Sequence, residues 1–179
     1  MDIYIIRHST TVWNEKGITQ GQTNNRLSKS GIEKTLLVAK SLENVEFDVI
    51  FTSPLMRAVQ TANLLNTNKK FRIVKDSRLI DINQGEFTGK VYKTLTSEQL
   101  KIKIERKGKN MESYKSVFMR TLDFYNEQIK GSGYKNVLIV THSINASSLE
   151  LILNNDLLGY LDESKLRNFA NAEIKKITI

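Results

Sequence analysis

Two stretches decide the fold, IYIIRH (residues 3–8) and VLIVTH (residues 137–142). In each, a short run of mostly branched apolar residues leads into a histidine. Continuous apolar runs of this length predict strands that are covered on both faces of a sheet. His8 and His142 are the only histidines of the chain. We therefore expect both just past the carboxyl ends of central strands, the edge at which open α/β sheets bind ligands.

The rest of the chain alternates short strand patterns with longer helical ones. Further strands are expected over Val49–Phe51 and Phe71–Val74, and the alternating run Glu173–Ile179 predicts an edge strand. This alternation predicts an α/β fold. We expect a three-layer sandwich, in which helices flank both faces of a mostly parallel central sheet.

Several helix starts can be predicted from the sequence. Ser30–Glu33 reads S-x-x-E, a capping box, and Ser53 with Pro54 predicts an N-cap followed by the first residue of the next helix. The helical spacing of four apolar residues predicts the buried stripe of that helix: Leu55, Val59, Ala62 and Leu65. Three further helices are expected. The first is capped by Ser97, the second spans Glu112–Lys130, and the third begins after His142 and runs to about Leu153.

Length and composition restrict the class of protein. A chain of 179 residues fits a single domain over 1–179, and the least orderly stretch, 89–111, is expected to be an insertion or cap over a site. The absence of cysteine excludes disulfides, thiolate zinc sites and cysteine nucleophiles. The apolar runs are too short for a membrane helix, and the N-terminus does not resemble a signal peptide. A cytoplasmic protein is therefore expected.

Cationic residues gather at the expected carboxyl edge. Arg7 precedes His8, and Arg57 lies one turn into the helix that follows the strand Val49–Phe51. A guanidinium group matches pairs of phosphate oxygens and stays charged, and a helix N-terminus also attracts anions. Together with His142 these residues predict a phosphate site. The nearby cations also lower the pKa of His8, which keeps it neutral and nucleophilic.

Four stretches occur in one order along most of the chain: IIRHSTTVWNEKGITQGQTNNRLSKSG (5–31), TSPLMRAVQTA (52–62), DSRLIDINQGEFTG (76–89) and VLIVTHS (137–143). In combination they resemble the histidine phosphatase superfamily, also called the phosphoglycerate mutase-like family. The resemblance implies the fold of that family and a metal-independent phosphatase without a cofactor. Its substrate would be a small phosphorylated molecule or a phosphoprotein.

The resemblance also implies a role for individual residues. His8 would be the nucleophile that becomes phosphohistidine, and Asp81 would be the general acid and base. The other implied catalytic or substrate-binding residues are Arg7, Asn14, Gln20, Gly21, Arg57, His142 and Ser143. Glu112 and Ser113 resemble a Glu-Ser pair of the phosphatase branch.

Two positions depart from the family pattern. Ser9 stands where the family has glycine, so it is expected either to fit or to tighten the pocket. Asp81 stands where the family usually has glutamate, and its shorter side chain would withdraw the carboxyl by about 1.5 Å unless the backbone moves. Glu86 is a rival acid.

Other functions compete with this interpretation. A P-loop over Gly85–Val91 fails on its glycine spacing and on the valine where Ser or Thr should bind magnesium. A bisphosphoglycerate-dependent mutase and a non-catalytic phospho-ligand binder remain alternatives. The basic run Lys101–Lys109 lacks interleaved aromatic residues, so we expect a solvated helix face and no nucleic-acid partner. The net charge of +8 alone carries little weight, and the oligomeric state cannot be predicted.

Overall fold

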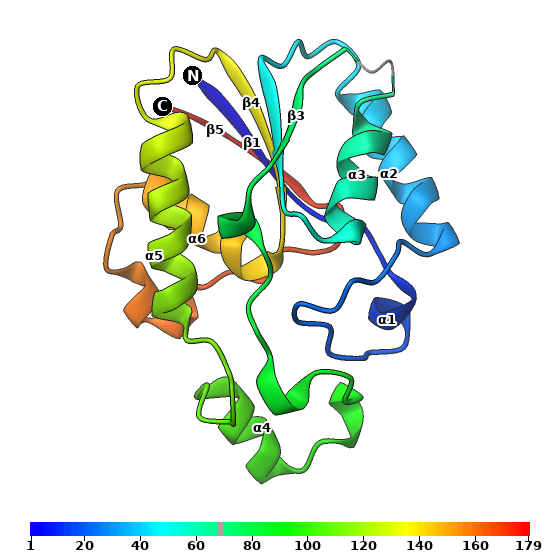
Figure 1. Cartoon of the computed structure of the whole chain (residues 1–179), viewed down its shortest axis with the longest axis vertical. Helices are drawn as coiled ribbons and strands as arrows, with labels where there is room; N and C mark the ends of the chain where they lie inside the picture. Colours follow the sequence, from blue (N-terminus) through cyan, green and yellow to red (C-terminus); the bar gives the residue numbers. More distant parts are fainter. Residues whose placement is uncertain (68–69) are drawn as a thin grey trace.

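The computed structural model describes residues 1–67 and 70–179. Its sheet has the order β3-β2-β4-β1-β5 (Figure 1). The strands are β1 Asp2–Arg7, β2 Val49–Thr52, β3 Ile73–Lys75, β4 Asn136–Thr141 and β5 Ile174–Thr178. β1 to β4 pair in parallel, whereas β5 pairs antiparallel to β1 at the edge. The mostly parallel sheet and the edge strand are thus confirmed; β3 begins two residues later than predicted.

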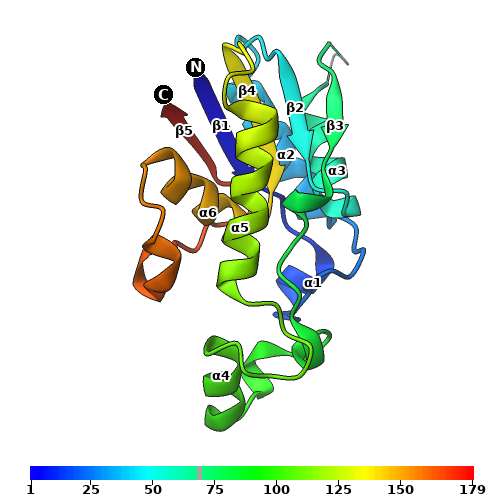
Figure 2. The ribbon, with the colours of Figure 1, turned by 60° about the vertical axis from the view of Figure 1, so that its left-hand side comes forward.

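Helices cover both faces of this sheet, as the two views show (Figures 1 and 2). They are α1 Val12–Glu15, α2 Lys29–Ser41, α3 Met56–Leu65, α4 Ser97–Ile104, α5 Tyr114–Phe124 and α6 Ser143–Leu153. α2 and α3 lie on one face, and α5 and α6 lie on the other. The predicted three-layer α/β sandwich is confirmed.

The core consists of two main apolar clusters, one on each face of the sheet. On one face Ile50 and Leu138 pack with Ala58 and Ala62 of α3. On the other face the sheet packs with Phe124 of α5 and with residues of α6. Because neighbouring strand residues point to opposite faces, a strand buried on both faces must be apolar throughout. This requirement explains the uninterrupted runs in β2 and β4.

Two helices start one or two residues from the predicted position. α2 is capped by Ser28, whose side chain accepts a hydrogen bond from the Gly31 amide, so the expected capping box at Ser30 is wrong. α4 is capped by Thr96, and Ser97 is its first residue. In both cases another hydroxyl residue close by takes the role of the N-cap.

The start of α3 was also predicted wrongly. The helix begins at Met56 after Leu55, and Ser53 does not cap it. Three residues of the predicted stripe are buried: Leu55, Ala62 and Leu65. Val59 is only half-buried, and the buried face also includes Arg57, Ala58 and Thr61. A polar arginine thus occupies the buried face of this helix.

The predicted helix Glu112–Lys130 is shorter and changes type. α5 is capped by Ser113 and ends at Phe124, and a π turn follows over Tyr125–Ile129. The prediction that α6 ends at Leu153 is confirmed. None of the helices in the described part of the chain is long and apolar enough to cross a membrane.

The stretch 89–111 holds a 3-10 turn over Tyr92–Thr94 and the helix α4. Both figures show α4 away from the sheet, beyond the carboxyl ends of its parallel strands (Figures 1 and 2). This is the edge at which the two histidines were expected.

Candidate active site

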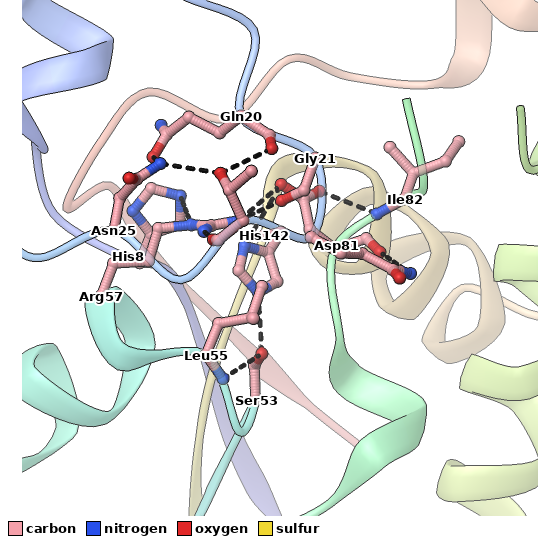
Figure 3. A network of polar contacts seen from close by, with 12 residues as sticks. His8, Gln20, Gly21, Asn25, Ser53, Leu55, Arg57, Asp81, Ile82 and His142 are labelled. Carbon is pink, nitrogen blue, oxygen red and sulfur yellow. Dashed lines mark hydrogen bonds and ion pairs between the residues drawn. The ribbon is translucent and has the colours of Figure 1, made fainter. Parts of the chain in front are cut away.

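The two histidines meet at the carboxyl edge of the sheet. His8 follows β1 and His142 follows β4, and these strands are neighbours. Both side chains are buried, and their ring centroids lie 5.1 Å apart. Arg57 of α3 and Asp81 join them there (Figure 3). The structure thus brings these four predicted residues together at one edge of the sheet.

Hydrogen bonding fixes the tautomer of His8. Its Nδ1 lies 2.7 Å from the carbonyl oxygen of Ser9, and a carbonyl can only accept, so Nδ1 carries the proton. Nε2 of the neutral ring then keeps its lone pair, and it accepts a hydrogen bond of 3.2 Å from Nε of Arg57. Burial holds the pKa of His8 well below its usual value, and Arg57 and Arg7 lower it further. The ring therefore stays neutral, and its Nε2 lone pair can attack once the hydrogen bond from Arg57 is released.

Arg57 is fully buried and held on three sides. Its Nη1 donates to the Thr23 carbonyl and its Nη2 to the Gly21 carbonyl, each at 2.7 Å. Nη2 also lies 2.8 Å from Oδ2 of Asp81. These bonds fix the position of the guanidinium, which can bind an anion once its contact with Asp81 is released.

Arg7 is a second guanidinium in the site. Its Nη1 donates to the Phe169 carbonyl, whereas its buried Nε has no hydrogen-bond partner in the described residues. Since a buried unsatisfied donor is costly, this N–H is suited to an incoming oxygen.

His142 also has a buried nitrogen without a partner. Its Nε2 lies 2.8 Å from Oγ of Ser53, which in turn accepts from the Leu55 amide at 3.3 Å. Ser53 can therefore donate its hydroxyl proton to Nε2, which leaves the ring proton of neutral His142 on Nδ1. Nδ1 has no hydrogen-bond partner among the described residues and lies 3.6 Å from Oδ2 of Asp81. It can donate to an anion bound between the two rings.

The shorter side chain of Asp81 still reaches the site. Oδ2 contacts Arg57 and faces His142, and Oδ1 accepts from the Ile82 amide at 2.9 Å. Burial raises the pKa of Asp81, although Arg57 and Arg7 oppose this effect. A carboxyl with a raised pKa holds a proton more readily, as an acid catalyst must. The rival Glu86 instead accepts a hydrogen bond from the Lys109 amide.

Ser9 does not narrow the pocket. Its hydroxyl donates to the Gly31 carbonyl at 2.8 Å, and its amide donates to Oγ1 of Thr61 at 3.0 Å. Both bonds point toward α2 and α3. The departure from glycine therefore strengthens the support beneath His8 without entering the cavity.

One cavity of about 260 Å³ is lined by Arg7, His8, Asp81 and His142. Four further residues that were expected to bind substrate also line it: Asn14, Gln20, Gly21 and Ser143. The amide oxygen of Asn14 accepts from the Thr11 amide at 3.1 Å, so its NH₂ group is the part available to an anion. Gly21 has a φ of +52°, which favours glycine at this turn. Ser143 is the first residue of α6, so the cavity also meets a helix N-terminus.

Three functional neighbours were missed by sequence reasoning. Asn171 donates to the His8 carbonyl at 3.1 Å although it lies 163 residues away, and no local pattern marks it. Ser53 was taken for a helix cap, whereas its hydroxyl contacts His142. Lys103 was assigned to a solvated face, but it lines the cavity. Only its position in the stretch 89–111 could have suggested this.

The donor set does not suggest a metal centre. Among the described residues, no group of three or more His, Cys, Asp or Glu side chains could hold a metal ion. The cationic side chains that line the cavity are Arg7 and Lys103, and Arg57 lies directly behind His8 and Asp81.

Comparisons with known proteins agree with this geometry. The chain is 31% identical over 147 residues to a putative phosphoserine phosphatase of Hydrogenobacter thermophilus, covering 78% of this chain and 72% of that protein. It is 32% identical over 99 residues to a probable phosphoglycerate mutase of Yersinia pestis, covering 55% and 46%. The fold matches the α-ribazole phosphatase structure from Shigella flexneri with a TM-score of 0.85 and 22% identity, over 100% of this chain and 91% of that chain.

The family model of the histidine phosphatase superfamily (branch 1) matches residues 3–179. The family and the relative named as a phosphatase confirm the expected enzyme class, hydrolases of phosphate esters. The predicted resemblance is confirmed, and the chain belongs to the histidine phosphatase superfamily.

Proposed function

We propose that this protein hydrolyses small phosphate monoesters through a phosphohistidine on His8, with Asp81 as general acid and base. The observation that carries the proposal is the fixed tautomer of His8, whose Nε2 lone pair lies beside Arg57 in the cavity. Nothing in this mechanism requires a metal ion or cofactor, because the protein supplies the positive groups.

The first step transfers the phosphoryl group to His8. Nε2 attacks phosphorus while the bond from phosphorus to the ester oxygen breaks. The leaving oxygen takes the proton of Asp81, so an alcohol departs and Asp81 becomes a carboxylate. Arg7, Arg57 and the Nδ1–H of His142 stabilise the charge on the three remaining phosphoryl oxygens.

The second step releases inorganic phosphate. Water attacks the phosphorus of the phosphohistidine, the bond from phosphorus to Nε2 breaks, and the Asp81 carboxylate takes a proton from the water. Neutral His8 and protonated Asp81 are thereby restored. Dividing one displacement into two in this way is the usual advantage of covalent catalysis.

The other cavity residues hold the substrate in this scheme. Asn14 donates to a phosphoryl oxygen, and Ser143 and the first amides of α6 face the anion. Gln20 and Gly21 form the wall beside the leaving group. The ion pair between Arg57 and Asp81 must loosen as the phosphoryl group takes up Arg57, which frees the carboxyl for its proton transfers.

Mutase activity is the competing function within the family, because a probable phosphoglycerate mutase is among the relatives. A non-catalytic binder is the other alternative. The departures at Ser9 and Asp81 were the reason to consider such a binder. Ser9 points away from the cavity, however, and the Asp81 carboxyl reaches the cavity, which argues against this reason.

The test is an assay of the purified protein on p-nitrophenyl phosphate and alkyl phosphates in the presence of EDTA. We expect turnover to survive EDTA and to vanish in His8→Ala, and turnover of the alkyl phosphates to fall about a hundredfold or more in Asp81→Ala. Asp123→Ala, which removes an exposed aspartate of α5, is the matched control and should match the wild type. Phosphate transfer between phosphoglycerates without net hydrolysis would instead identify a mutase, and binding without turnover would identify a phospho-ligand binder.

A further inference from the structure

The segment 169–172, which lies between α6 and β5 (Figure 1), packs against the residues that carry the nucleophile. The Phe169 carbonyl accepts from Nη1 of Arg7, although the two residues are 162 positions apart. The Ala172 amide donates to the Arg7 carbonyl at 3.1 Å and to the His8 carbonyl at 3.4 Å. This segment therefore holds Arg7 and His8 from outside the loop that follows β1.

The backbone of this segment is strained at Ala172. Its φ of +59° lies in the left-handed region, which favours glycine, and the residue is buried. A non-glycine residue keeps such a conformation only where the surrounding structure imposes it, and such residues gather at active sites. Here the conformation directs the Ala172 amide at the carbonyls of Arg7 and His8.

Asn171 brings a side-chain donor to the same place. Its Nδ2 lies 3.1 Å from the His8 carbonyl oxygen, 3.4 Å from Oδ1 of Asn14 and 3.5 Å from the Ser9 carbonyl oxygen. All three neighbours can only accept hydrogen bonds, so the NH₂ group of Asn171, and not its oxygen, must point at them. The bond to His8 is the shortest of the three and is expected to be the strongest.

These contacts fix the nucleophile at two points. The His8 carbonyl belongs to the backbone from which the ring projects. The Ser9 carbonyl is the acceptor that keeps the ring proton on Nδ1, at 2.7 Å. Asn171 does not touch the reacting Nε2, so it acts through the position of His8. Such a role is valuable because a misplacement of about 1 Å can cost a hundredfold in rate.

The groups that bind the phosphoryl oxygens have other supports. Oδ1 of Asn14 also accepts from the amide and the hydroxyl of Thr11, at 3.1 and 2.9 Å. Arg57 is held by two backbone carbonyls, and His142 is held by the Ser53 hydroxyl. Loss of the Asn171 side chain should therefore impair attack by His8 more than binding of the phosphoryl group.

We propose that Asn171 is a positioning residue, which holds the His8 backbone and the Nδ1-protonated ring in the orientation for attack. The inference rests on the proposed function, since it assumes that His8 is the nucleophile. It makes the segment 169–172 part of the active site, although no residue of this segment lines the cavity.

The test separates attack from binding. The rate of attack is the release of p-nitrophenol from p-nitrophenyl phosphate in the first turnover, and binding is the Kd of ethylphosphonate, which cannot be hydrolysed. We expect Asn171→Ala to slow the first turnover about tenfold and to change the Kd by less than about twofold. An unchanged rate, or a rate and an affinity that fall by the same factor, would refute the proposal.

Asn171→Asp tests whether the donated hydrogen bond matters or only the shape. The aspartate fills the same space, but its oxygens face the His8 carbonyl without a proton to donate. We expect the first turnover to be slowed at least as much as in Asn171→Ala. A rate close to that of the wild type would show that Asn171 is only a filler. The Kd comparison is confined to Asn171→Ala, because a carboxylate would also repel the ligand.

The ring of His8 gives a spectroscopic signature. His8 and His142 are the only histidines of the chain, so ¹⁵N NMR can follow both rings. In the wild type we expect the His8 proton on Nδ1, and in Asn171→Ala we expect part of it to move to Nε2. His142 should keep its tautomer, because its partner is Ser53. An unchanged His8 tautomer would remove the Ser9 contact from the proposal.

Asn66 provides a matched control for a purely structural asparagine. It is buried at the end of α3, and its side chain makes two hydrogen bonds with the backbone of Phe71, at 2.9 and 3.2 Å. Asn66→Ala should lower the stability to urea while the first turnover keeps its rate. If Asn171→Ala slows the first turnover no more than Asn66→Ala does, the proposal fails.

Failure here is distinguishable from failure of the proposed function. Turnover by the wild type and its loss in His8→Ala test the nucleophile without reference to Asn171. A wild type that forms phosphohistidine as fast as Asn171→Ala retains the function and loses the inference.

Discussion

His8 and Asp81 are titratable side chains whose pKa values are displaced in opposite directions. The pKa of His8 is lowered, so the base form needed for attack persists into acid solution. The pKa of Asp81 is raised, so the acid form needed by the leaving group persists to higher pH. Burial is the main cause of both shifts, because it disfavours whichever form is charged. The same cavity thus favours a neutral nucleophile and a neutral acid.

The role of Asp81 predicts a dependence on the leaving group. Asp81→Asn should reduce kcat/KM for an alkyl phosphate by about a hundredfold or more, because an alkoxide leaves poorly without a proton. The loss should be smaller for p-nitrophenyl phosphate, whose phenolate leaves without help. The fall in wild-type activity as the pH rises through the raised pKa of Asp81 should also disappear. Equal losses on both esters would show that Asp81 is not the general acid.

At the scale of residues, the sequence was sufficient to predict a site residue where that residue directly follows a strand. His8 and His142 were predicted together because β1 and β4 are uninterrupted apolar runs. Asn171 and Lys103 could not be predicted, because each reaches the site from a distant part of the chain. Contacts of that range depend on the folded path of the backbone.

At the scale of elements, α2 supports the loop that carries the nucleophile. Gly31 lies in its first turn, and a Cβ there would lie 2.0 Å from the carbonyl oxygen of Thr10. The Gly31 carbonyl accepts the hydroxyl groups of both Ser9 and Thr35. The helix therefore packs on the segment directly after His8 at a distance that only glycine allows.

This contact predicts losses of stability of different size for two small substitutions. Gly31→Ala should destabilise the fold by about 3 kcal/mol, because the methyl group meets backbone that cannot rotate away. Ser9→Ala should cost about 1 kcal/mol and leave kcat nearly unchanged, because Thr35 still donates to the Gly31 carbonyl. Urea denaturation with a parallel activity assay measures both, with Lys34→Ala on the exposed face of α2 as the control. A Gly31→Ala protein as stable as the wild type would contradict this packing.

The starts of the elements were harder to predict than their existence. A serine near a helix start can cap the helix or bond elsewhere, and tertiary contacts decide between these roles. Ser53 contacts His142, so α3 begins without a side-chain cap. The sequence therefore predicted that α3 exists but not its first residue.

At the scale of the whole molecule, the buried histidines link stability to pH. Both have pKa values well below 6.5 in the folded protein, whereas an unfolded chain has values near about 6.5. Below that pH the unfolded state binds more protons, so the free energy of unfolding decreases as the pH falls. Asp81, with its raised pKa, opposes this trend by taking up a proton in the folded state.

We therefore expect the thermal midpoint to fall when the pH is lowered from about 7 to about 5. His8→Asn removes one of the two histidines and should make this decline shallower. Differential scanning calorimetry across the pH range measures both slopes. Identical slopes for the wild type and His8→Asn would mean that His8 is not held neutral by the fold.

The most direct test of the account is to trap the phosphorylated enzyme. The protein is mixed with a phosphate monoester, quenched in base within a single turnover and measured by intact mass and peptide mass spectrometry. We predict one added phosphoryl group on His8, stable in base and lost in acid, and none in His8→Ala. Turnover of the ester without any phosphoryl group on His8, or with one on another residue, would contradict the central claim.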